Sequence, residues 1–291
     1  MFQTMAKAAN DIGVPPIGPE PIVEAATGVG RRGLWVVAIL MLLSSLVFYV
    51  LAARVAVTKR LFHVLVSLVT TVSFLVYFAM AMGYGSCLAH QGSHKHYKDS
   101  PEIPREIFRE LYWIRFLNWT LTSPLILICL SLLSGLNGAS LLVAVSGNLV
   151  LFVAGLASTA INHRGRQWAW FTIACLGYLT VVYQIGYQGR RSTLAKDQQT
   201  RRFYSSIAGF SLIVLLVYPI IWAASSNARK MSVDAEIIVY AILDILSQAV
   251  FGYWLIVSHD SMQSITLNLD GFWANGLGNE GSIRVGDQED A

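Results

Sequence analysis

The chain has 291 residues, of which 55% are hydrophobic and only 13% are charged. Soluble domains carry about 25% charged residues, so this composition excludes an ordinary soluble protein of the same size. The net charge of +4 is small, and we infer no nucleic-acid-binding function from it.

Apolar residues fall in long blocks between two polar ends. Residues 1–32 contain Gly, Pro and acidic residues and lack the apolar core of a signal peptide, so we expect a flexible N-terminal tail. Seven blocks with the length of a membrane-spanning helix follow. Residues 261–291 are polar and Gly-rich, and we expect a C-terminal tail. The blocks cover approximately residues 33–53, 62–86, 110–134, 139–161, 168–188, 204–226 and 235–258.

The length of the blocks decides between the two structures that can cross a bilayer. Only helices and closed barrels satisfy their backbone groups in lipid, and barrel strands need about ten alternating residues. The sequence therefore predicts an all-α membrane protein, a seven-transmembrane-helix bundle over residues 33–260. Two connections are longer than the others: residues 87–109 are polar with two prolines, and residues 189–203 are strongly basic.

The distribution of Lys and Arg bears on the orientation of the bundle. A bare count of basic residues in the loops does not favour either orientation. With the N-terminus outside, however, the Lys and Arg residues of the cytoplasmic loops lie close together in short segments. Those of the outer loops are spread through a longer loop that also contains acidic residues. We therefore expect the N-terminus outside and the C-terminus in the cytoplasm.

Two ionisable side chains lie clear of the ends of the predicted spans. Arg115 lies in the third block and Asp244 in the middle of the seventh. Each alone would carry a large desolvation cost, so we expect the two to neutralise each other. Two roles stay open: an ion pair that fixes the third helix to the seventh, or a proton or ion relay.

Other polar and aromatic residues follow the same helix faces. Helical periodicity places Asn118, Trp119 and Thr122 on the face of Arg115, and Gln248 on the face of Asp244. These two stripes are expected to face each other across a polar, hydrogen-bonded interior. Aromatic residues of other blocks could line the same interior, namely Tyr77, Tyr218 and Trp222.

Four segments together resemble the microbial rhodopsin family. The third block reads YWIRFLNWTLTSPLILICLSLLSG at residues 112–135, which is similar to the third helix of that family. The second block contains YFAMAMGYG at residues 77–85, the sixth contains YPIIW at residues 218–222, and the seventh contains LDILSQAVFG at residues 243–252. The resemblance covers all seven blocks in order and implies the rhodopsin fold.

The resemblance also implies that three functional positions are replaced. The position of the retinal lysine falls on Gln248, that of the Schiff-base counter-ion on Asn118, and that of the proton donor on Cys129. A Gln amide nitrogen is not nucleophilic, so it forms no Schiff base. The six lysines all lie outside the spans, and we expect no covalent retinal: Lys7, Lys59, Lys95, Lys98, Lys196 and Lys230.

The positions that are kept belong to the polar interior. This combination resembles the fungal opsin-related proteins, including the thirty-kilodalton heat-shock proteins of the plasma membrane, which lack the lysine. That resemblance implies a stress or homeostasis role at the plasma membrane, an action on the proton ATPase, and a homo-oligomer. The residues that match the family are Arg115, Tyr77, Tyr218, Trp119, Trp222 and Asp244.

Three functions remain open at this point. The first is a retinal-free regulatory or stress protein with an opsin fold. The second is a transporter or channel for protons or weak acids that uses Asp244 and Arg115. The third is a sensor that binds retinal or another apolar ligand without a covalent bond, although Leu215 replaces a Trp that packs on retinal in the family. The sequence contains no nucleophile–base pair, metal cluster or phosphate loop that would indicate an enzyme.

Overall fold

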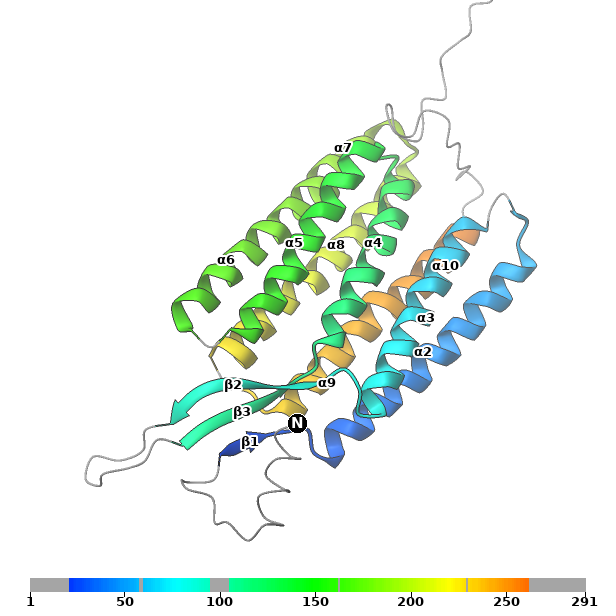
Figure 1. Ribbon diagram of the computed structural model, residues 1–291. Coiled ribbons are helices and arrows are strands. Elements are labelled where there is room, and N and C mark those ends of the chain that lie inside the picture. The colour runs from blue at the N-terminus through cyan, green and yellow to red at the C-terminus, as the bar shows by residue number, and fades with distance from the viewer. Residues whose placement is uncertain (1–20, 58–59, 95–104, 162, 229, 262–291) are drawn as a thin grey trace, which may run out of the picture.

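The computed structural model describes residues 21–57, 60–94, 105–161, 163–228 and 230–261 (Figure 1). Seven helices in this part of the chain are long and apolar enough to cross a membrane, which confirms the predicted bundle. The first four are α2 (Gly28–Arg54), α3 (Leu61–Ala81), α4 (Ile114–Ser134) and α5 (Gly138–Ala160).

The last three spans each contain a π-helical segment. The fifth consists of α6 (Arg164–Val181), η2 (Val182–Gly189), α7 (Arg190–Ser192) and the short 3₁₀ turn η3 (Thr193–Ala195). The sixth consists of α8 (Gln198–Trp222) and η4 (Ala223–Asn227), and the seventh of α9 (Val233–Asp244), η5 (Ile245–Val250) and α10 (Phe251–Ser261). Such bulges occur frequently at functional sites, and η5 contains Gln248.

Side-chain caps explain where several helices begin after short turns. Asn137 accepts a hydrogen bond from the backbone N–H of Ser140 at 2.7 Å and starts α5. Asp197 starts α8 in the same way, accepting from the N–H of Thr200 at 2.9 Å. This hydrogen bond holds the pKa of Asp197 below its usual range. Gly135, with φ of 74°, ends α4 in the left-handed conformation that favours glycine.

A small sheet covers one end of the bundle (Figure 1). Strands β2 (Cys87–His94) and β3 (Arg105–Leu111) pair antiparallel, and β1 (Ile22–Glu24) pairs parallel to β3. The expectation that residues 1–32 form only a flexible tail is therefore wrong for residues 22–32, which contain β1 and the start of α2. Residues 1–20 and 262–291, the remainder of the two predicted tails, lie outside the described residues.

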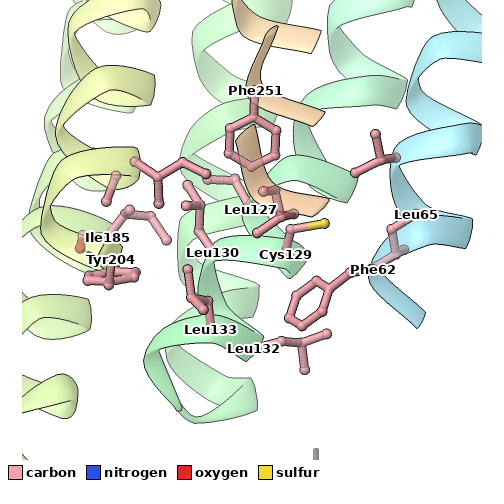
Figure 2. Close-up of a cluster of buried hydrophobic side chains, with 14 of the residues drawn as sticks. Phe62, Leu65, Leu127, Cys129, Leu130, Leu132, Leu133, Ile185, Tyr204 and Phe251 are labelled. Atoms are coloured by element: carbon pink, nitrogen blue, oxygen red, sulfur yellow. Dashed lines mark hydrogen bonds between the residues drawn. The ribbon is translucent and has the colours of Figure 1, made fainter. Parts of the chain in front are cut away.

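The end of the bundle opposite the sheet contains a large apolar cluster, shown in part in Figure 2. It joins α3, α4, α8, α10 and the π-helical η2. Cys129, fully buried, lies inside this cluster among leucine and phenylalanine side chains. The polar interior around Asp244 lies on the sheet side of this cluster. Labelled members are Phe62, Leu65, Leu127, Leu130, Leu132, Leu133, Ile185, Tyr204 and Phe251.

Candidate functional site

Asp244 lies at the centre of the polar interior. Its carboxylate accepts hydrogen bonds from the Tyr77 hydroxyl at 2.5 Å, the Tyr218 hydroxyl at 2.6 Å and the Trp119 indole N–H at 2.7 Å. All four side chains are buried. The three donors come from α3, α8 and α4, so one carboxylate on α9 holds four spans together. The structure thus brings Tyr77, Trp119 and Tyr218 together at Asp244.

One turn further along the seventh span, Gln248 joins a second group of polar side chains. Its amide N–H faces the Thr122 hydroxyl at 3.5 Å, and its amide oxygen contacts the Ser73 hydroxyl. The Ser73 hydroxyl also lies 2.9 Å from the amide oxygen of Asn118. A serine hydroxyl has one proton, so Ser73 can donate to only one of these oxygens at a time. Asn118 and Gln248 are therefore joined through Ser73, a residue that was not identified from the sequence.

The predicted direct ion pair between Arg115 and Asp244 is wrong. Among the described residues, the ion-pair partner of Arg115 is Glu236, with 3.7 Å between Nη1 and Oε1. The guanidinium also lies 4.8 Å from the centre of the Tyr240 ring. It lies 5.7 Å from the centre of the Tyr112 ring, and burial raises the pKa of that phenol to about 12. Arg115 therefore faces the sheet end of the interior, while Trp119 takes the place beside Asp244.

Arg109 on β3 is a buried cation within residues 87–109, which the sequence indicates only as a polar connection. Its guanidinium is 2.8 Å from Glu24 and 2.8 Å from Glu236, and it donates to the Met231 carbonyl at 3.0 Å. Glu236 thus lies between Arg109 and Arg115. This group connects β1, β3, α4 and α9, and so couples the sheet to the bundle.

Aromatic rings from other spans pack around Trp119. The Trp119 ring lies with its centroid 5.5 Å from Phe152, 5.1 Å from Tyr240 and 6.0 Å from Trp222. A Cβ atom on Gly155 would lie 2.7 Å from the Trp222 ring, so this cluster requires a glycine on α5. Trp222 therefore packs in the aromatic cluster and does not contact Asp244 itself.

A cavity of about 50 Å³ lies beside Gln248. Trp119, Thr122 and Leu215 contribute to its wall. One buried water needs roughly 10–15 Å³ when volume is measured in this way, so the cavity has room for a few water molecules. Both polar side-chain atoms of Asn148, which also lines the cavity, lack a protein partner among the described residues, as expected beside a hydrated space.

A buried histidine at the opposite end was not identified from the sequence. His63 on α3 is fully buried, and its Nε2 lies 3.4 Å from the carboxylate of Asp260. The His259 ring lies 6.3 Å away. His63 lies at the end of the second predicted block, and only ionisable residues well inside a block were taken as candidates.

The geometry predicts which acid is coupled to Arg115. Arg115→Gln and Glu236→Gln should be non-additive in the free energy of unfolding, with a coupling of roughly 0.5–3 kcal/mol. The coupling between Arg115→Gln and Asp244→Asn should be smaller, because no direct ion pair joins those two residues. Double-mutant cycles on unfolding in detergent measure both. A larger coupling with Asp244 would contradict this assignment.

Comparison with known proteins places the chain in a family. The family model described as bacteriorhodopsin-like protein matches residues 32–262. Opsin-1 of Neurospora crassa is 38% identical over 95% of this chain and 92% of its own length. The opsin-like protein carO of Fusarium fujikuroi is 26% identical over 82% of this chain and 76% of its own. The crystal structure of a light-driven proton pump from Leptosphaeria maculans matches with a TM-score of 0.80 and 36% identity, covering 84% of this chain and all of that one. The chain therefore belongs to the bacteriorhodopsin-like family of microbial rhodopsins.

Proposed function

We propose that this chain is a retinal-free member of its family with a regulatory or stress-response role at the plasma membrane, and that it is not a light-driven pump. The observation that carries the proposal is the Gln248 amide, which lies one turn from Asp244 and contacts Ser73 and Thr122. A Schiff base with retinal needs a primary amine, and an amide nitrogen cannot replace it.

The surroundings of the other replaced positions support the same proposal. Asn118 offers no carboxylate to accept a proton, and Cys129 lies in the apolar cluster of Figure 2. Proton relays need several titratable groups along the path. The alternative of proton or weak-acid transport relies on Asp244 and Arg115, yet Asp244 is held by three donors and Arg115 faces Glu236. Neither residue extends a path across the apolar cluster.

The small cavity bears on the alternative of a noncovalent ligand sensor. Sites for drug-sized ligands have volumes of about 300–1,000 Å³. The cavity beside Gln248, at about 50 Å³, would have to open before a polyene could enter. It therefore supports a hydrated interior more than a pocket for an apolar ligand.

The proposal also includes the orientation of the chain in the membrane and its binding partner. We place the N-terminus and the sheet outside the cell and the C-terminus in the cytoplasm. A proton ATPase is the candidate partner for a role in proton homeostasis, and a homo-oligomer is the expected assembly. Co-purification from the native membrane, with identification of the bound proteins, is the experiment that names the partner.

Addition of all-trans retinal tests the retinal-free state. The natural protein should give no red-shifted visible band that hydroxylamine bleaches, because such a band requires a protonated Schiff base and the interior contains no amine. The light-driven pump from Leptosphaeria maculans, treated in parallel, is the positive control. A retinal adduct in the unmutated protein would overturn the proposal.

A further inference from the structure

The fifth span carries an open groove on its outer side. This span, Arg164–Ala195, is the least buried of the seven, with 22% of its most apolar window buried. The groove has a volume of about 870 Å³ and lies toward α7, at the end of the bundle opposite the sheet (Figure 1). Its walls include Leu179, Tyr183, Tyr187, Arg190, Arg191 and Arg201.

The groove changes from apolar to basic along the helix axis. From Leu179 to Arg190 a helix rises about 16 Å, roughly the depth of one leaflet of the hydrocarbon core. Tyr183 and Tyr187 lie between these two levels, more than half exposed, with their rings stacked at 5.6 Å. Aromatic residues in this position are typical of the membrane–water interface. The apolar wall therefore faces acyl chains, and the arginines lie at the level of the headgroups.

The basic end of the groove has no acidic partner in the described chain. Arg190 and Arg191 come from α7 and Arg201 from α8, and none of them forms an ion pair with a described residue. Asp197 is the acidic residue nearest to these arginines in sequence. It does not line the groove, and its carboxylate caps the start of α8. Guanidinium groups match the geometry of phosphate oxygens, and basic pockets at the ends of membrane helices bind anionic lipid headgroups.

A glycine beside the groove lets the fifth span pack closely against α8. Gly186 lines the groove, and a Cβ atom there would lie 3.2 Å from Cδ1 of Leu212 on α8. A larger side chain at Gly186 would press against α8, so this position does not test the groove alone. Leu179 lines the groove and is 57% exposed, so the apolar wall can be changed there without altering the charge.

We propose that this groove binds an anionic phospholipid of the adjacent leaflet. The phosphate is held by Arg190, Arg191 and Arg201, and one acyl chain lies along Leu179 and Tyr183. The binding site is separate from the polar interior around Asp244, so it does not depend on the presence or absence of retinal. With the N-terminus outside, the leaflet is the cytoplasmic one.

Lipid titration of the full-length protein in detergent tests the proposal. Phosphatidylglycerol and phosphatidylcholine with identical acyl chains are compared by the midpoint of thermal unfolding and by native mass spectrometry of bound lipid. We expect phosphatidylglycerol to be retained and to raise the midpoint more than phosphatidylcholine does. Each groove arginine that is removed should weaken the apparent affinity about five-fold, so Arg190→Gln with Arg201→Gln should weaken it about 25-fold.

A matched pair of variants controls for charge alone. Arg54→Gln with Arg202→Gln removes the same charge from exposed positions at the same end of the bundle and should leave the affinity within about two-fold. Leu179→Gln keeps every charge, makes the apolar wall of the groove polar and should reduce lipid retention. An equal loss of lipid affinity in the groove pair and in the control pair would overturn the proposal, because the lipid would then bind through the overall charge of this end of the bundle. Stabilisation by soluble glycerol phosphate equal to that by the lipid would also overturn it, in favour of a site for the anion only.

Discussion

Asp244→Ala should lower the free energy of unfolding by on the order of 4 kcal/mol. The substitution removes the acceptor of three buried donors, the hydroxyls of Tyr77 and Tyr218 and the indole N–H of Trp119. A buried donor without a partner costs about 1–3 kcal/mol. Because the donors come from three other spans, the loss should be seen as reduced cooperativity of the whole bundle. Unfolding in detergent, followed by the loss of helical circular dichroism, measures it.

A neighbouring residue provides the control for Asp244→Ala. The Ser247 hydroxyl lies 3.1 Å from that of Tyr218 and is part of the same region. Ser247→Ala removes one neutral hydrogen bond and should cost about 1 kcal/mol. Asp244→Asn keeps one acceptor oxygen and should fall between the two. A loss below about 1 kcal/mol in Asp244→Ala would show that water satisfies the three donors.

The spans could be predicted from the sequence because lipid imposes a strict length and polarity on every crossing segment. Their ends were less certain. The predicted second block runs to residue 86, but α3 ends at Ala81, before Gly83 and Gly85 with positive φ. The third block was predicted from residue 110, although α4 begins at Ile114, because the apolar residues Leu111, Tyr112 and Trp113 precede the helix directly.

The sheet was missed because its buried face contains a cation. Along β3, the buried positions are Ile107, Arg109 and Leu111. An arginine in the middle of this face conceals the alternation that normally indicates a strand. Its partners Glu24 and Glu236 are distant in sequence, so no local pattern could show that the charge is neutralised. Only the packed fold brings the three side chains together.

The sequence predicts which side chains of one helix face the site. It does not predict which residues of two neighbouring helices lie at the same level. Periodicity correctly placed Trp119 on the inner face of α4, where it binds Asp244. It could not decide which acid on the seventh span lies level with Arg115. Glu236 and Asp244 are eight residues apart, about 12 Å along a helix. The choice between them depends on the axial shift between α4 and α9, which a sequence pattern does not contain.

Gln248→Lys should convert the protein into one that forms a retinal adduct. The new amine would lie one turn from Asp244, in the wall of the cavity that also contains Leu215. The adduct requires the cavity to widen, and Leu215 is a flexible side chain that can move. Asp244 would be the carboxylate closest to the Schiff base, but three hydrogen bonds already engage it. We therefore expect only a weak red-shifted band at pH 7.

Adding Asn118→Asp to Gln248→Lys should strengthen the red-shifted band. The new carboxylate faces Gln248 across Ser73 and would stabilise the protonated Schiff base through its negative charge. Val250→Lys, with the amine two residues later on the exposed side of the seventh span and outside the cavity wall, is the matched control and should form no pigment. Spectra of the three variants with all-trans retinal, before and after hydroxylamine, decide the outcome. Failure of both Gln248→Lys variants to bind retinal would show that the interior cannot open, which would favour an interaction role over a ligand sensor.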